Sequence, residues 1–111
     1  MQEREIQHAI RLALGLEDGL ELMVNTQGMF ADERGNKRRV GLGIGTPDLV
    51  GILAPTGRLF ALEVKSETGR LRPEQKLCRA RWLKLGAFVA TVRSVDEAKA
   101  ALARARNGEA E

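Results

Sequence analysis

Residues 45–67, GTPDLVGILAPTGRLFALEVKSE, contain the pattern that decides the fold. The apolar runs LVGIL and RLFALEV lie on either side of APTG, and proline and glycine between two such runs are typical of a tight turn. We therefore predict a β-hairpin that turns at residues 54–57. Three charged residues, Asp48, Glu63 and Lys65, lie at the open end of this hairpin.

The position of the turn determines which residues face each other. If Leu53 faces Arg58, the numbers of opposed residues sum to 111, and Asp48 lies directly opposite Glu63. Directly opposed residues have Cβ atoms about 4.5–5.5 Å apart, and like charges at that distance destabilise a sheet. Burial increases the penalty, because a carboxylate removed from water needs a partner. Another positive charge must therefore balance this pair.

Side-chain alternation predicts that the hairpin is covered on both faces, as in α/β proteins. One face combines the charged residues with apolar ones: Asp48, Val50, Ile52, Leu59, Ala61, Glu63 and Lys65. The other face is apolar: Leu49, Leu53, Phe60, Leu62 and Val64.

A divalent cation would balance the two carboxylates. Lys65 offsets only part of their charge, whereas carboxylate oxygens with bound waters suit Mg²⁺ or Mn²⁺. One histidine and one cysteine, far apart in the sequence, form no zinc pattern. A metal beside a lysine is suited to phosphodiester hydrolysis. The competing interpretation is a salt-bridge ladder on an exposed strand, which a lone E-x-K would favour; the opposed Pro-Asp favours the metal site.

Two further residues are predicted to converge on this site. Glu3 falls on the apolar stripe of the first predicted helix, formed by Ile6, Ile10 and Leu14, so it could complete the metal shell. It could equally be an acidic residue favoured by the helix dipole. Gln75, in the first turn of a later helix, could hold a phosphate or water, or it could serve in capping or packing.

Basic residues are concentrated in two segments, although the whole chain carries only +3. Residues 70–84 contain six basic residues and one acidic residue, and a second cluster lies at 37–39. Local fields of this kind attract polyanions, although each cluster alone could be a solvated surface. The predicted DNA-binding residues are Lys37, Arg38, Arg39, Arg70, Arg72 and Lys76.

The chain's composition is that of one globular domain, residues 1–111. It is 43% apolar and 30% charged, which excludes disordered and fibrous classes. No apolar stretch is long enough for a membrane span, and the start of the chain lacks the apolar segment of a secretory signal. A single cysteine excludes an internal disulfide. We expect a cytoplasmic location without membrane contact.

The predicted order of elements is α-β-β-β-α-β-α. Helices are predicted from the N-terminus to near Gly15, from Pro73 to before Gly86, and from a capping box at 94–97 to about Arg106. Beside the hairpin, strands are predicted at 20–25 and 87–92. Residues 26–45 are expected to form a mobile loop, with a possible fragment of strand near Val40, and residues 107–111 a frayed tail.

Taken together, these motifs resemble the VRR-NUC branch of the PD-(D/E)xK nuclease superfamily. The resemblance includes GTPD at 45–48, EVK at 63–65, Gln75 in the following helix and the preceding helix EREIQHAIRLALG. It implies a restriction-endonuclease-like fold, with an αβββαβ core around a mixed central sheet flanked by helices. By position it implies that Asp48 and Glu63 are metal ligands, with Val64 included in the metal set, and that Lys65 is the catalytic lysine.

The same resemblance implies divalent-metal-dependent DNA cleavage by a homodimer acting on branched DNA such as four-way (Holliday) junctions. Gln75 matches the family's helix glutamine, and Glu3 matches its helix acid, with Glu5 as the alternative for that position. Leu12 lies opposite the apolar stripe of its helix and could contribute to a dimer interface. The alternative is a DNA-binding module that retains the nuclease fold without cleaving.

Overall fold

The computed structural model describes residues 1–111. Its elements follow in the order α1 (Glu3–Leu14), β1 (Leu20–Val24), β2 (Gly28–Ala31), β3 (Lys37–Val40), β4 (Leu49–Leu53), β5 (Arg58–Val64), α2 (Pro73–Lys84), β6 (Phe88–Val92) and α3 (Val95–Arg106). The helices and the strands of the central sheet match the sequence predictions to within one residue at most of their ends.

The central sheet is mixed and has the strand order β1-β4-β5-β6. The pairs β1–β4 and β4–β5 are antiparallel, whereas β5 and β6 are parallel. In the β4–β5 hairpin, Leu53 pairs with Arg58 and Leu49 pairs with Leu62. The predicted register is therefore confirmed, and it places Asp48 one residue beyond the last pair, across from Glu63.

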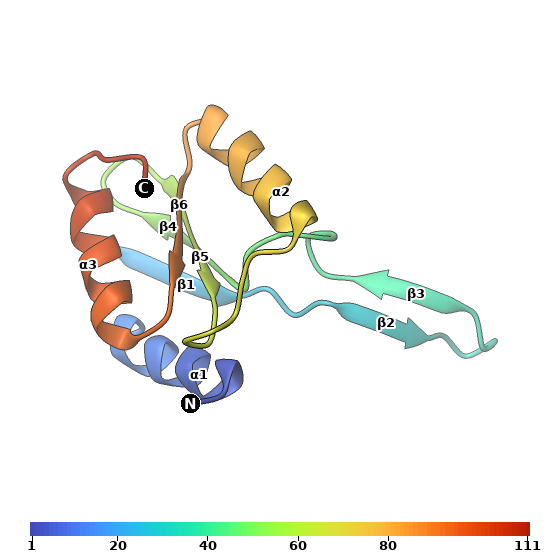
Figure 1. Ribbon diagram of the computed structural model, residues 1–111. Coiled ribbons are helices and arrows are strands. Elements are labelled where there is room, and N and C mark those ends of the chain that lie inside the picture. The colour runs from blue at the N-terminus through green and yellow to red at the C-terminus, as the bar shows by residue number, and fades with distance from the viewer.

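Helices cover both faces of this sheet (Figure 1). Helices α1 and α3 pack on the face that carries Leu49, Phe60 and Leu62, and their side chains form the larger hydrophobic cluster with that face. Helix α2 lies on the opposite face, where Trp82 and Leu83 pack against a smaller cluster of Val50, Ala61, Ala87 and Val89. Coverage of both faces agrees with the prediction from strand alternation.

The segment 26–45 differs from the prediction of a mobile loop, although the predicted fragment of strand near Val40 is present as β3. Strands β2 and β3 pair antiparallel, from Gly28 with Val40 to Ala31 with Lys37, and form a separate two-stranded sheet. This ribbon projects from the body of the protein (Figure 1). The sequence GMFA and KRRV lacks the apolar alternation of a half-buried strand, so the pattern on which strand prediction depends is missing.

The tail at 107–111 also differs from the prediction that it is frayed. The Val89 amide donates to the Ala110 carbonyl, 3.3 Å away, on the sheet edge formed by β6. Arg58 donates to the Glu109 carbonyl at 2.7 Å, and Arg104 donates to the Glu111 carbonyl at 3.1 Å. The first two of these contacts join residues that are far apart in the sequence, so a local sequence pattern could not predict them.

None of the helices combines the length and the apolar character needed to cross a membrane.

Helix α2 rests directly on the loop that carries the GTPD motif. Gly45 has φ +83°, and a Cβ atom at this position would lie 2.4 Å from the Glu74 carbonyl oxygen. The absence of a side chain at Gly45 therefore lets the first turn of α2 approach the segment that leads into Asp48.

Replacing Gly45 with alanine should destabilise the fold by two effects, the strained φ and the collision with α2. Gly35→Ala is the matched control, because Gly35 has φ +80° and no atom within 4 Å of an added Cβ. We expect about 1–2 kcal/mol of destabilisation from backbone strain in both variants and about 1–3 kcal/mol more in Gly45→Ala. Urea unfolding measures both, and equal losses would contradict the close packing of α2 on Gly45.

Candidate functional site

The hairpin's open end brings Asp48 and Glu63 together. Asp48 immediately precedes β4, and its Oδ2 accepts a hydrogen bond of 2.9 Å from the main-chain amide of Val64. This bond crosses from one strand to the other and fixes the Asp48 carboxylate beside the residue that follows Glu63. The prediction that the two acids face each other on one side of the sheet agrees with this geometry.

Glu63 and Lys65 are both almost fully buried, with 5% and 7% of their surface exposed. The Lys65 Nζ lies 4.0 Å from the Glu63 Oε1. Buried charges in proteins are ordinarily paired, because the interior solvates them poorly. The pair is therefore part of a closed polar cluster and not of an exposed salt-bridge ladder.

The electrostatic environment of Glu63 is unfavourable to its charge. Burial, the hydrogen bond to the Asp48 carboxyl and repulsion by the Asp48 charge raise the pKa of Glu63 to about 9, Glu3 adds a smaller repulsion, and Lys65 acts in the opposite direction. At neutral pH Glu63 therefore holds a proton, which leaves the charge of Asp48 to be balanced by Lys65.

Gln75 connects this cluster to helix α2. Its Nε2 donates to the Glu63 Oε1 at 3.1 Å, while its Oε1 accepts from the main-chain amide of Arg72 at 2.8 Å, at the helix N-terminus. One side chain thus caps the helix and orients the carboxyl. Of the alternatives considered for Gln75, the capping role is present, and it occurs together with contact to the site.

Asn25, which sequence reasoning did not single out, organises the GTPD motif. Its Nδ2 donates to the Thr46 Oγ1 at 2.8 Å and to the Pro47 carbonyl at 2.9 Å, while its Oδ1 accepts from the Leu42 amide at 3.1 Å. Its main-chain amide also donates to the Asp48 carbonyl. A polar residue at the end of the first predicted strand, beside the glycine-rich segment, was the only available signal.

Arg93 is a second residue that the prediction missed. It donates to the carbonyls of Ser66 and Gly69, each at 2.6 Å, and thereby holds the loop that follows Lys65. Arg93 follows β6, and parallel strands β5 and β6 end at the same edge of the sheet. That shared edge could have indicated the contact once the parallel pairing was known.

Glu3 lies near this cluster but not inside it. Its carboxylate is close to Gly69, since a Cβ built there would lie 3.5 Å from the Glu3 Oε2, and its charge contributes to the pKa of Glu63. Glu3 and Glu5 are both exposed. The structure contains no group of three or more His, Cys, Asp and Glu side chains close enough to hold a metal ion, so the carboxylate pair of Asp48 and Glu63 stands without a third direct partner.

The residues at the site fit a hard divalent cation. Their donors are oxygens, and burial together with the neighbouring Asp48 carboxyl raises the pKa of Glu63, so a charged Glu63 needs a further positive partner. Mg²⁺ usually keeps several waters and binds one or two carboxylates, so a complete protein cage is not required. The Val64 side chain is a hydrocarbon, so its main-chain carbonyl is the only metal ligand that this residue could offer.

The predicted DNA-binding residues lie on two parts of the surface. Lys37, Arg38 and Arg39 form most of β3 on the projecting ribbon, and Arg70, Arg72 and Lys76 lie before and within the start of α2; all six are exposed. Arg38 pairs with Asp32 at 3.3 Å, and Arg72 pairs with Glu74 at 3.2 Å. The second group adjoins Gln75, so part of the basic surface borders the buried cluster.

Comparisons with known proteins agree with this architecture. A family model described as the VRR-NUC domain matches residues 3–96. A solved structure described as a VRR_NUC domain superposes with a TM-score of 0.63 at 24% sequence identity, covering 93% of this chain and 97% of that one. The predicted mixed α/β fold with flanking helices is confirmed. A comparison with curated proteins finds no match.

The raised pKa of Glu63 makes stability depend on pH. The folded carboxyl titrates at about 9 and an ordinary one at 4.5, so between these values the folded state holds a proton that the unfolded chain has lost. Stability in EDTA should therefore fall as pH rises through this window. The variant Glu63→Gln should lose this pH dependence. At the upper end of the pH window its free energy of unfolding should exceed that of the wild type by about 1 kcal/mol or more, roughly 4–8 °C in Tm.

Thermal unfolding across the window measures this effect. Glu67→Gln, at an exposed position two residues after Lys65, is the control and should retain the wild-type pH dependence. If Glu63→Gln lost stability with rising pH as steeply as the wild type, the burial of a protonated Glu63 would be contradicted.

Proposed function

This chain belongs to the VRR-NUC family of nuclease-type domains, and from that premise we propose that it is a Mg²⁺- or Mn²⁺-dependent endonuclease that hydrolyses DNA phosphodiester bonds. The observation that carries the proposal is the buried cluster of Asp48, Glu63, Lys65 and Gln75 at one end of the sheet. A purely structural site would gain more from apolar residues of similar size than from one buried and one half-buried carboxyl.

Asp48 and Glu63, with the main-chain carbonyl of Val64, are the groups that would hold the cation, and the Glu3 charge acts on Glu63 from nearby. When bound, the ion polarises the phosphate and lowers the pKa of a coordinated water. Lys65 supplies a positive charge and hydrogen-bond donors for the oxygens on which negative charge builds. Gln75 holds the Glu63 carboxyl in place, and Asn25 holds the loop that carries Asp48.

Exposed basic residues supply the contacts with DNA in this proposal. Arg70 and Lys76 flank the buried cluster on the α2 side and form no ion pair in the structure. Lysine and arginine at such positions neutralise phosphates and release counterions, which is the main source of sequence-independent affinity for DNA. These contacts would present the backbone to Lys65 without requiring a particular base sequence.

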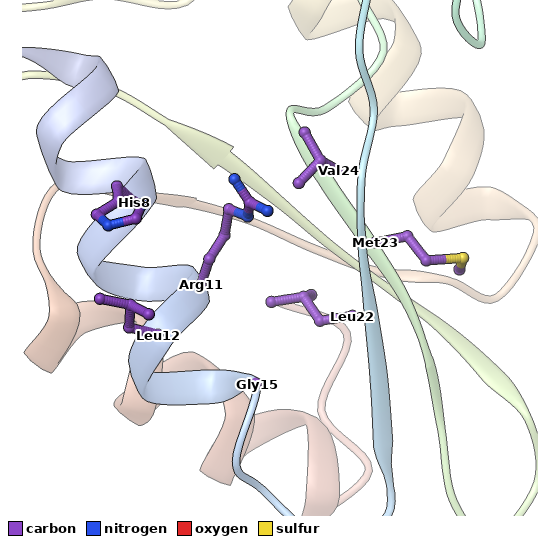
Figure 2. Close-up of a pocket in the computed structure, with 7 residues that line it drawn as sticks. All are labelled: His8, Arg11, Leu12, Gly15, Leu22, Met23 and Val24. Carbon is purple, nitrogen blue, oxygen red and sulfur yellow. The ribbon is translucent and has the colours of Figure 1, made fainter.

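We further propose that two copies form a symmetric dimer that acts on branched DNA. Strand β1 pairs only with β4, so its other edge is free. Beside it, Leu12, Leu22, Met23 and Val24 line a cavity of about 270 Å³ between α1 and β1 (Figure 2), and Leu12 is 62% exposed. An uncovered edge with apolar neighbours is a surface that a second copy could cover, and a four-way junction presents two related phosphates to such a pair.

Cleavage of a labelled four-way junction with Mg²⁺ or Mn²⁺ tests the enzymatic proposal. The wild type should cut, whereas Asp48→Asn and Lys65→Ala should each lose about 100-fold or more in rate, as when one stabilising group is removed from other active sites. Lys99→Ala, an exposed lysine on α3, should cut at the wild-type rate. A wild type that binds the junction without a metal-dependent product would instead identify a non-cleaving DNA-binding module.

The same assay over intact duplex, flap and four-way substrates, run with a measurement of mass in solution, tests the finer proposals. A dimer mass together with faster cutting of the junction supports them. A monomer that cuts all substrates equally would contradict both the dimer and the preference for branched DNA.

A further inference from the structure

The β2–β3 ribbon has no core of its own. None of its residues belongs to either hydrophobic cluster of the protein, and the ribbon extends away from the sheet and helices (Figure 1). An isolated two-stranded hairpin is only marginally stable in water. Nearly all of its side chains are exposed, so they are available to a partner.

The register of the ribbon separates its side chains into two faces. Cross-strand partners point to the same face, so Arg39 lies beside Met29 and Lys37 beside Ala31 on one face. Arg38 lies beside Phe30 on the opposite face. The three consecutive basic residues of β3 thus divide into a pair, Lys37 and Arg39, and a single Arg38 facing the other way.

The charges on these two faces differ. The Arg38 guanidinium is paired with Asp32 at 3.3 Å, and Asp32 also accepts bonds from the Arg34 and Asn36 amides in the turn. Lys37 and Arg39 form no ion pair. They lie two residues apart on one strand, roughly 7 Å, so one face carries two neighbouring cations without a counterion.

The base of the ribbon is tied to the nuclease cluster. Asn25, between β1 and β2, accepts a bond from Leu42, just after β3, and it also donates to the carbonyl of Pro47, next to Asp48. Gln27 adds a bond of 3.0 Å from its Nε2 to the Thr46 carbonyl. These bonds hold the segments that lead into β2 and out of β3 beside the GTPD segment, so the base of the ribbon has a defined position relative to Asp48.

We propose that the ribbon is a DNA arm that enters the major groove of the duplex beside the cleavage site, with its Lys37–Arg39 face toward the phosphates. This inference rests on the proposed function and extends it from a basic surface to a particular groove. The major groove, about 12 Å wide, admits a two-stranded β-ribbon, and DNA supplies the negative charge that this face lacks. A second copy of the chain fits this face poorly, because two such faces would repel each other.

Single substitutions on opposite faces give a charge-matched test. Arg39→Ala and Arg38→Ala each remove one positive charge from an exposed position. Binding to a duplex-containing junction is measured in EDTA, so that no cleavage occurs, by fluorescence anisotropy at several salt concentrations. Arg39→Ala should weaken binding about tenfold and reduce the slope of log K against log salt by about 0.9. Arg38→Ala should change the affinity less than twofold.

Equal effects of Arg38→Ala and Arg39→Ala, or no effect of either, would overturn the assignment of a DNA-facing side. The result is separable from the nuclease proposal. If the wild type cleaves DNA but Arg39→Ala binds it normally, the DNA arm is contradicted and the nuclease proposal stands. If the wild type does not cleave DNA but Arg39→Ala loses binding, the DNA arm stands and the nuclease proposal is contradicted.

Methylation of guanine N7 tests the groove, because N7 lies in the major groove. A junction methylated at its guanines should bind the wild type more weakly than an unmodified one. The double variant Lys37→Ala/Arg39→Ala should show less than half of that loss. Equal sensitivity of the two proteins, or none in the wild type, would overturn the placement of the ribbon in the major groove.

Discussion

The contact between the Glu63 and Asp48 carboxyls, in a place largely closed to water, is the constraint on which the rest of the structure depends. A second carboxylate charge is unfavourable there, because only one lysine is close by. The raised pKa of Glu63 means that, without a bound ion, Glu63 retains its proton at neutral pH. A divalent cation would offset the second charge without that proton. In the proposed function, relief of this unfavourable pairing is what would favour the uptake of such an ion.

The scaffold around this pair consists of residues that each hold two parts of the protein. Gln75 caps α2 and bonds to Glu63, Asn25 joins the ribbon to the GTPD segment, and Arg93 joins the end of β6 to the loop after Lys65. Gly45 lets α2 approach closely enough for the first of these contacts. Gln75 contacts the pair directly, and Asn25 and Arg93 hold the segments next to it, so the geometry of the pair depends on helix α2 and on the loops beside the sheet.

The sequence was sufficient for the carboxyl pair because the information was local. A tight turn at 54–57 and the two-residue alternation of strands set the register, and the register placed Asp48 across from Glu63. The ribbon was not predictable in the same way, because GMFA and KRRV bury no face and carry no apolar alternation. The bonds of Arg93 and of the C-terminal tail depend on strands far apart in the sequence, so they required the assembled sheet.

The roles of the basic residues were also only partly predictable from the sequence. Their composition indicated a polyanionic partner, but only the β2–β3 register separates Arg38 from Lys37 and Arg39. For Glu3, the sequence prediction and the structure differ. Its helix phase predicted that it faces the cluster, whereas the structure leaves it exposed and outside any group of three acids.

Calorimetric titration of the protein with Mn²⁺ tests the central claim most directly. The account predicts that the wild type takes up the ion and that Asp48→Asn and Glu63→Gln each lose most of this binding, whereas Glu67→Gln keeps it. Absence of uptake by the wild type, or uptake that survives both substitutions unchanged, would contradict the assignment of the carboxyl pair as a metal site.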